Sequence, residues 1–378
     1  MNILIINWRS IKDPLKGGAD LATFEHAQKW VENRQANVFW LAPKYQKDID
    51  QEVIAGIKFV YLAGPFRDGL LNFLFQFLKF YISVFLYYLS HFQGRIDVII
   101  DQVHGIPYLT PLYAKEKVIA YIHEVAGNIW DFEFPFPVNL IGKTLEKALL
   151  RLFYRKTIFV TGSPSTKKDL IGLGLPEKNI KIVAYGVSVL PIKHVEKQEN
   201  FTVMFLGRLV KMKGIERALK AFFLLKNSLP EAKMWVAGTG RPEYQKQLER
   251  LCQELNIENE TIFFSPVSDE EKINLLSKTN VLLNPSYKEG WGLVNLEANR
   301  RATPVVAFNV KGNRDSVKDG ISGFLVEDND LAAMAKAILK VRALGKPLQQ
   351  SALEYSKKFD WAKPVDEFYK ILQNNHAQ

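Results

Sequence analysis

Short apolar runs alternate with longer segments of helical periodicity along nearly the whole chain. Strands that alternate with helices are joined by crossover connections, so this pattern predicts parallel β-sheets covered by helices. Some runs, such as 118–122 (VIAYI), are apolar throughout, which is typical of a strand covered on both faces. The predicted strands are Ile3–Ile6, Val38–Leu41, Lys58–Leu62, Val98–Ile100, Val118–Ile122, Ile158–Val160, Ile180–Val183, Val203–Leu206, Met234–Ala237, Ile262–Phe264, Val281–Leu283, Val305–Ala307 and Gly323–Val326.

The strands fall into two series, which divide the chain into two similar halves. The stretch between them, Leu190 to Asn200, is polar, contains a proline and lacks periodicity, as linkers do. We therefore expect an α/β protein of two Rossmann-like, doubly wound domains facing across a cleft, because such sheets bind ligands beyond the carboxyl ends of their strands. The expected parts are a first domain (1–190), a linker (191–200), a second domain (201–358) and a terminal helix (359–378) that can pack back on the first domain.

The composition limits the partners and the compartment. A net charge of +10 suits nucleic acid, an anionic membrane surface or phosphorylated small molecules. Nucleic acid is not expected, since the sequence has no zinc-ligand cluster, RNA-binding aromatic motif or long basic tail. The single cysteine, Cys252, cannot form an intrachain disulfide, and the opening MNILIINWRS predicts a strand rather than a signal peptide. We therefore expect a cytoplasmic protein.

The segment from Gly69 to Phe92 is long and apolar enough to raise the question of a transmembrane helix. Asn72, Gln76 and Lys79 interrupt it, and a lysine at the bilayer centre costs about 2.5–3.5 kcal/mol. Their spacing of four and three residues places them on one helical face. We expect an amphipathic helix that is largely buried in the first domain. Contact with a membrane is the alternative, and a true span is the least favoured.

A second stretch, from Leu140 to Lys168, is basic and partly amphipathic. Lysines and arginines near an anionic surface each contribute about 1 kcal/mol to binding. Together with the apolar segment, this stretch predicts peripheral contact with the inner face of a membrane, whereas the alternative is an ordinary solvated face. Its basic residues are Lys143, Lys147, Arg151, Arg155, Lys156, Lys167 and Lys168.

The motif with the strongest chemical signal is PSYKEGWGLVNLEANRRATP, residues 285–304. It follows an apolar run, turns through two glycines and enters a predicted helix. Glycine permits close approach of a ligand to the backbone, and the free amides at a helix start suit an anion. Two carboxylates, Glu289 and Glu297, flank the turn and can accept hydrogen bonds from vicinal hydroxyls. The alternative is a plain turn with solvated acids. The backbone positions concerned are Gly290, Gly292, Leu293 and Val294.

Three further motifs follow predicted strands or precede helices. In FLGRLVKMKGI (205–215), Arg208 and Lys213 suit a diphosphate, unless they form a solvated basic loop. In LKGGADLATF (15–24), Gly17 and Gly18 resemble a phosphate-cradling turn, although a simple tight turn fits equally. In AYIHEVAGNIW, His123 ends a strand and can bond a sugar hydroxyl, or be a histidine satisfied within the fold.

In this order the motifs resemble glycosyltransferase family 4, a retaining family of the GT-B fold, across nearly the whole chain. The resemblance rests on GGA, the strand-end histidine, GRL-x3-KG and E-x7-E, of which EGWGLVNLEA is the most specific. It implies transfer of a sugar from a nucleotide-diphosphate donor to a hydroxyl acceptor, which can be a lipid-linked glycan, a glycolipid or a polysaccharide precursor. Family members generally retain the anomeric configuration and need no metal.

The resemblance also implies roles for individual residues. Gly17 and Gly18 would lie near the donor phosphate, and His123 would contact the transferred sugar. Arg208 and Lys213 would hold the diphosphate, Glu289 the sugar hydroxyls and Glu297 the nucleotide ribose. The 266–268 segment would lie against the base. The catalytic set is then His123, Arg208, Lys213 and Glu289, and the donor-binding set is Gly17, Gly18, Gly207, Gly238, Val267, Gly290, Gly292, Leu293, Val294 and Glu297.

Two observations bear on cofactors and on departures from the family pattern. Asp48-Ile49-Asp50 matches the metal-binding DxD motif of the other glycosyltransferase fold, but its polar surroundings predict a surface loop, so no metal and no cofactor are expected.

Ala302 stands where the family usually has glycine, and costs about 1 kcal/mol if the backbone there has positive φ. Ser265-Pro266 and 313–315 also depart from the pattern.

Two other functions share these features. A sugar-phosphate synthase or a nucleotide-sugar epimerase would keep the fold and change the reaction. A catalytically silent partner subunit would keep the fold without the reaction. Retention of Arg208, Lys213 and both glutamates of E-x7-E favours an active transferase.

Overall fold

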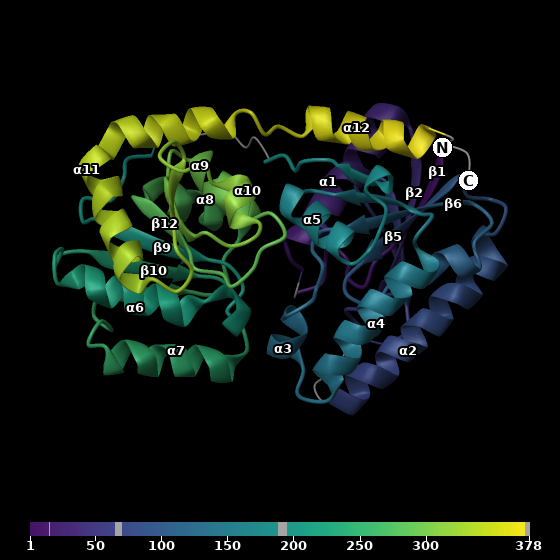
Figure 1. The fold of residues 1–378 in the computed structure, drawn as a ribbon, viewed down its shortest axis with the longest axis horizontal. Coiled ribbons are helices and arrows are strands. Elements are labelled where there is room, and N and C mark those ends of the chain that lie inside the picture. The colour runs from purple at the N-terminus through teal and green to yellow at the C-terminus, as the bar shows by residue number, and fades with distance from the viewer. Residues whose placement is uncertain (15, 65–69, 188–194, 375–378) are drawn as a thin grey trace. The chain divides into compact units, whose positions relative to one another are not determined.

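The computed structural model describes every residue except 15, 65–69, 188–194 and 375–378 (Figure 1). It divides into two compact units. Unit 1 comprises residues 1–186 and 361–378, and unit 2 comprises residues 187–360. The sequence predicted that the first domain ends at residue 190 and the second at residue 358. Each predicted boundary lies within a few residues of the observed one. Residues 191–194 of the expected linker lie outside the described residues.

Among the described residues, unit 1 is built on an eight-stranded sheet in the order β3-β4-β2-β1-β5-β6-β7-β8. All pairs are parallel except β3 with β4. Ile3 to Ile6 in β1 are fully buried, because helices cover both faces of the sheet. The strands are β1 (Asn2–Ile6), β2 (Asn37–Pro43), β3 (Gln51–Ile54), β4 (Ile57–Leu62), β5 (Val98–Val103), β6 (Lys117–Ile122), β7 (Ile158–Thr161) and β8 (Ile180–Ile182).

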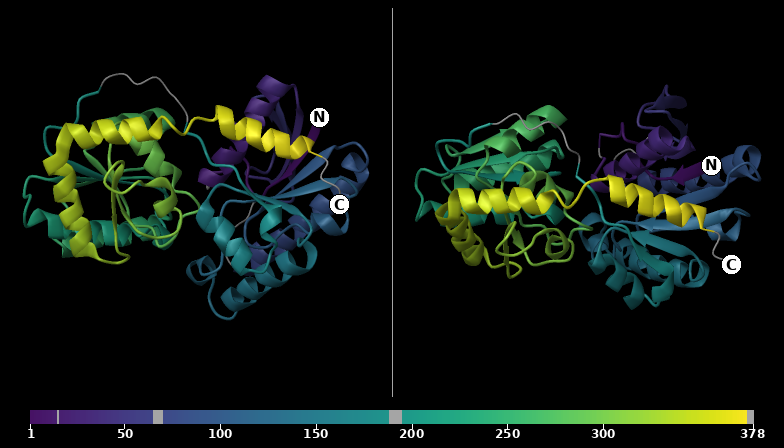
Figure 2. Two further views of the ribbon diagram at one scale, coloured as in Figure 1. Left: turned by 45° about the horizontal axis from the view of Figure 1, so that its top comes forward. Right: turned by 90° about the horizontal axis from the view of Figure 1, so that it is seen from above.

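The last helix of the chain belongs to unit 1 and lies along its first helix (Figures 1 and 2). Trp30 packs edge-on against Phe368, with 5.2 Å between the ring centroids, and its indole N–H donates to the Val365 carbonyl at 3.2 Å. The helices of unit 1 are α1 (Gly18–Arg34), α2 (Leu70–Tyr87) with its π-helical end η1 (Tyr88–Phe92), η2 (Thr110–Leu112), α3 (Ile129–Glu133), α4 (Val138–Phe153), α5 (Pro164–Gly172), η3 (Glu177–Asn179) and α12 (Ala362–Gln373).

Within the described residues, unit 2 holds a six-stranded parallel sheet in the order β11-β10-β9-β12-β13-β14. Its strands are β9 (Thr202–Leu206), β10 (Lys233–Ala237), β11 (Thr261–Phe264), β12 (Val281–Asn284), β13 (Val305–Phe308) and β14 (Gly323–Val326). Its helices are η4 (Lys211–Lys213), α6 (Ile215–Lys226), α7 (Pro242–Glu254), α8 (Asp269–Lys278), α9 (Leu293–Asn299), α10 (Asn313–Ser316) and α11 (Leu331–Ser356). The long α11 bends at Gly345, where the backbone is not helical (Figure 2).

Both units therefore have the predicted architecture of parallel sheets with crossover helices. Each predicted strand is present. The sequence missed β3, an edge strand whose residues are exposed or half-buried and partly polar. The segment 48–50 lies in an exposed to half-buried loop directly before it, as predicted for a surface loop.

The expectation that the 69–92 helix is largely buried is wrong. Residue 69 lies outside the described residues, and the rest forms α2 and η1. Phe80, Val84 and Tyr88 pack on the sheet, but the opposite face is open to solvent. By length and composition, 72–92 is the one helical stretch among the described residues that could cross a membrane, and only 17% of its most apolar window is buried. The apolar side chains that are 37–63% exposed are Leu74, Phe75, Leu78, Ile82, Phe85, Leu86 and Leu89.

Candidate active site

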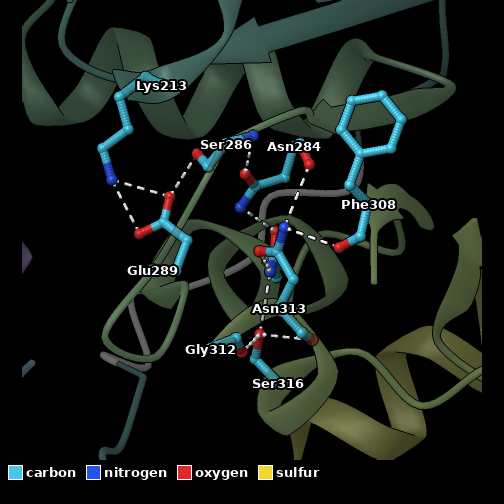
Figure 3. A network of polar contacts seen from close by, with 9 residues as sticks. Lys213, Asn284, Ser286, Glu289, Phe308, Gly312, Asn313 and Ser316 are labelled. Carbon is cyan, nitrogen blue, oxygen red and sulfur yellow. Dashed lines mark hydrogen bonds and ion pairs between the residues drawn. The ribbon is translucent and has the colours of Figure 1, made fainter. Parts of the chain in front are cut away.

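Two charged residues from separate predicted motifs meet in unit 2. Lys213 ends η4, between β9 and α6, and Glu289 lies in the loop that follows β12. The Lys213 Nζ is 2.7 and 2.8 Å from the two carboxylate oxygens of Glu289, and Ser286 donates its hydroxyl to the same carboxylate at 2.7 Å (Figure 3). The side chains of Lys213 and Glu289 are 20% and 11% exposed. The pair is thus shielded from bulk water but still reachable.

A buried network of amide side chains anchors the loop that carries Glu289 (Figure 3). Asn284, at the end of β12, donates to the side chain of Asn295 in α9 at 2.9 Å. Asn295 in turn donates to Asn313 and Ser316 in α10, at 3.2 and 2.9 Å. Asn313 donates back to the Asn284 carbonyl at 3.2 Å. All four residues are buried, so the network ties the end of β12 to both short helices.

Arg217, in the first turn of α6, supports the same loop. Its guanidinium lies over the rings of Tyr287 and Phe308, 4.1 and 4.2 Å from their centroids. It also donates to the Pro285 carbonyl at 3.2 Å and pairs with Asp328. A planar cation that stacks and bonds at once holds its partners in one geometry. Arg217 is therefore a positioning residue for the Glu289 loop.

Arg208 is a cation without an ion-pair partner among the described residues, and it is half-buried. Its loop is fixed by the neighbouring backbone, because the Gly207 N–H donates to the Ala237 carbonyl at 3.0 Å. The loops after β9 and β10 pass so closely that a Cβ at Gly238 would lie 1.9 Å from the Gly207 carbonyl oxygen. A fixed loop thus presents an uncompensated guanidinium.

Glu297 lies in α9, but it is already paired. The Lys272 Nζ in α8 is 3.1 Å from a Glu297 carboxylate oxygen, and their side chains are 21% and 28% exposed. Burial lowers the pKa of Lys272, but the charges of Glu297 and Asp269 outweigh it and raise the pKa overall. Val267, predicted to lie against a base, stands just before α8 and packs partly on the core beneath α8 and α9.

The turn before α9 has the backbone that its glycines predicted. Gly292 caps the helix with φ of +81°, and a Cβ there would come within 2.6 Å of the Asn295 side chain. The first N–H groups of a helix have no acceptor within it. Those of Leu293 and Val294 stand in a helix of only seven residues. Gly290, Leu293 and Val294 are half-buried.

In unit 1, Gly17 and Gly18 stand at the start of α1. The Gly17 N–H donates to Asp20 at 2.9 Å, and Asn7 donates to the same buried carboxylate at 3.0 Å. Gly17 has φ of −127°, and a Cβ there would meet no described atom within 4 Å. The fold itself therefore does not require glycine at position 17, and there is room for a ligand beside it.

His123 follows β6 and is 5% exposed. Its Nδ1 shares a hydrogen bond with the Tyr185 hydroxyl, and its Nε2 lies 3.3 Å from Thr23 Oγ1. Burial, and then the charges of His104 and His26, hold its pKa well below the ordinary value. The ring is thus neutral with both nitrogens engaged, which is the alternative that the sequence left open. A direct sugar contact by this ring would require exchanging one of these bonds.

Comparison with known proteins identifies the family of the second unit. A family model described as glycosyl transferases group 1 matches residues 189–359. An uncharacterized glycosyltransferase of Methanocaldococcus jannaschii is 26% identical over 95% of both chains. A D-inositol 3-phosphate glycosyltransferase of Mycolicibacterium smegmatis is 34% identical over 43% of this chain, which spans 38% of that protein.

Solved structures match nearly the whole chain. A sucrose-phosphate synthase from Thermosynechococcus elongatus has a TM-score of 0.79 at 20% identity, with 98% of each chain covered. WaaG, a glycosyltransferase involved in lipopolysaccharide biosynthesis, has a TM-score of 0.77 at 16% identity, covering 99% of this chain and all of that one. The whole chain has the fold of GT-B glycosyltransferases, and residues 189–359 match the group 1 glycosyl transferases. The finer assignment to family 4 stays a prediction.

The site of this glycosyltransferase contains residues that sequence reasoning missed. The structure joins Lys213 to Glu289, both predicted. It adds Ser286 and Arg217 to their surroundings, and Lys272 as the partner of Glu297. Arg217 could have been noticed as an arginine on an otherwise apolar helix face. Lys272 carries no local signal, since only the fold brings α8 to α9.

Proposed function

We propose that this glycosyltransferase moves a sugar from a nucleotide-diphosphate donor to a hydroxyl acceptor with retention of the anomeric configuration. The observation that carries the proposal is the Lys213–Glu289 ion pair. Arg208 in the same β9–α6 connection has no ion-pair partner among the residues that the structure describes. Lys213 and Arg208 suit the diphosphate, and Glu289 suits the sugar hydroxyls. The diphosphate and the sugar are adjacent parts of one donor molecule, and Lys213 and Glu289 are likewise adjacent in the fold.

The proposed chemistry uses these residues as follows. The bond between the anomeric carbon and the diphosphate oxygen breaks, and the acceptor oxygen bonds to the same face of that carbon. The acceptor proton leaves with the nucleoside diphosphate. Negative charge develops on the diphosphate as it departs, so Arg208 and Lys213 stabilise the transition state more than the bound donor. Since these cations supply the charge, we propose transfer without a metal or cofactor.

A donor screen tests this function. The enzyme is incubated with UDP-, GDP- and ADP-sugars, and nucleotide release and thermal stabilisation are measured. One donor class should both raise the melting temperature and release its nucleotide. No release and no stabilisation with any nucleotide sugar would contradict the proposal.

We further propose that the enzyme is cytoplasmic and attaches peripherally to the inner face of a membrane, where a lipid-linked acceptor would be found. The support is the exposed apolar face of α2. The same helix contacts the segment between α3 and α4 through Phe73, whose ring lies 5.4 Å from that of Phe134. An apolar helix face can enter the interfacial zone of a bilayer. This segment adds Phe136, which is 78% exposed.

Positive charge is exposed on α4 and just after it. Lys147 and Arg151 on α4, and Arg155 and Lys156 just after it, are exposed and have no ion-pair partner among the described residues. Basic side chains beside an apolar face complement an anionic lipid surface. Co-sedimentation with liposomes tests this attachment. Binding should require anionic lipid and fade with salt, and failure to pellet with any lipid at low salt would contradict it.

A further inference from the structure

A cavity of about 480 Å³ opens on unit 1 at the carboxyl ends of β2 and β4. Lys44 and Lys47 follow β2, Ala63 and Gly64 follow β4, and the remaining wall comes from α2. In the sheet, β4 pairs with β2 and β2 pairs with β1, whose following loop leads to Gly17. Open α/β sheets bind ligands at this edge. None of the residues that line the cavity belongs to the donor site described above.

The cavity carries uncompensated positive charge. Its described walls contain three lysines and no acidic residue. Lys44 is paired with Asp50. Lys47 and Lys79 are exposed and have no ion-pair partner within the described residues. Like charges that face one space repel each other, and an anion placed between them removes that repulsion.

The wall from α2 is the polar stripe already visible in the sequence. Asn72, Gln76 and Lys79 line the cavity together. The Oε1 atom of Gln76 is buried and has no hydrogen-bond donor among the described residues. A buried acceptor without a donor is costly, so a ligand hydroxyl there would be favoured. The amide groups of Asn72 and Gln76 also carry N–H donors suited to phosphate oxygens.

The same helix places this polar wall beside its apolar face. Phe75 and Leu78, which alternate along α2 with Gln76 and Lys79, are 63% and 60% exposed. A ligand held here by an anionic group could therefore extend an apolar chain along α2. We propose that this cavity binds the phosphate of a lipid-linked acceptor, and that this phosphate neighbours the hydroxyl that receives the sugar. This proposal rests on the proposed function.

Lysine footprinting of the full-length enzyme tests the phosphate site. The protein is acetylated with and without inorganic pyrophosphate, and the rate at each lysine is followed by mass spectrometry. Acetylation of Lys47 and Lys79 should slow severalfold. Lys336 and Lys346, exposed in unit 2, serve as internal controls and should be unaffected. No slowing at Lys47 and Lys79, or equal slowing at all four, would overturn the proposal.

A second comparison identifies the source of the phosphate. Phosphatidylcholine vesicles containing phosphatidic acid are compared with soluble glycerol 3-phosphate at the same total phosphate. A lipid-linked ligand predicts that the vesicles protect Lys47 and Lys79 at lower phosphate concentration. Equal or better protection by glycerol 3-phosphate would overturn the lipid-linked part and indicate a soluble phosphorylated acceptor.

A variant separates this proposal from the proposed function. Gln76→Glu keeps the side-chain shape and adds a negative charge to the cavity. About five times more pyrophosphate should then be needed to protect Lys47 from acetylation. This factor is the effect of repulsion by one unit charge at ~4 Å in water. Acceptor-independent release of nucleotide from the donor should be unchanged. Unchanged protection contradicts the cavity assignment. Failure of wild-type enzyme to release nucleotide contradicts the transferase mechanism instead, whatever the footprint shows.

Discussion

The Lys213 ammonium and the Glu289 carboxylate form a bidentate ion pair at 2.7 and 2.8 Å, although 76 residues of chain separate them. Each neutralises the other in this structure. In the proposed reaction, the donor diphosphate competes with Glu289 for Lys213. The carboxylate then becomes available to the sugar hydroxyls, so the pair would couple binding of the phosphate to binding of the sugar.

Lys213→Ala should lower turnover by a factor of about 10²–10³, because it removes a charge that stabilises the departing diphosphate. Lys211→Ala is a matched control, since Lys211 lies in the same η4 turn but is exposed. Initial rates of nucleotide release measure the effect, and melting temperatures show whether either variant is misfolded. Full activity in a folded Lys213→Ala enzyme would show that Lys213 does not take part in the reaction.

Gly17→Ala should leave stability nearly unchanged, because the added Cβ meets no described atom within 4 Å. If the donor phosphate approaches this backbone, the same methyl group should weaken donor binding and raise KM. Gly172→Ala is the control, since a Cβ there also meets nothing within 4 Å. Equal kinetics in both variants would show that no ligand approaches Gly17.

Ala302→Gly should stabilise the protein by about 0.5–1 kcal/mol. Ala302 has φ of +52°, as anticipated from the glycine usual at this position, and glycine adopts such a backbone without strain. Ala332→Gly, at an exposed site in α11, should instead destabilise by about 1 kcal/mol. Chemical denaturation compares the variants. Destabilisation by Ala302→Gly would contradict the strain argument.

Stability should fall as the pH drops below about 6.5. His26 is fully buried among aromatic rings, neither ring nitrogen has a partner among the described residues, and burial lowers its pKa to about 3. Between these two pH values His26 is protonated in the unfolded chain but not in the folded chain. The free energy of unfolding therefore falls by about 1.4 kcal/mol for each pH unit. In His26→Leu, unfolding curves should show a shallower loss from pH 6.5 to 5. An unchanged slope would assign the acid sensitivity to other groups.

The strands, their parallel pairing and the loops that carry Arg208, Lys213 and Glu289 could be predicted, because apolar periodicity and glycine turns are local signals. The meeting of Lys213 with Glu289 could only be expected through the family resemblance. Lys272 could not be placed beside Glu297, because their contact depends on the packing of α8 against α9.

The exposure of α2 could not be predicted from composition. Its apolar residues surround most of the helix, and the sequence does not show which of them a neighbour covers. In the structure only one side, with Phe80 and Val84, meets the sheet. His123 shows a similar limit, since its partner Tyr185 is 62 residues away.

The most direct test of the account measures nucleotide release from the preferred donor in excess EDTA, by the wild-type enzyme and by Arg208→Ala. If fixed cations replace a metal at the diphosphate, wild-type activity should persist in EDTA, and Arg208→Ala should lose most of it under both conditions. Loss of wild-type activity in EDTA, restored only by magnesium or manganese, would contradict the account, as would full activity of Arg208→Ala.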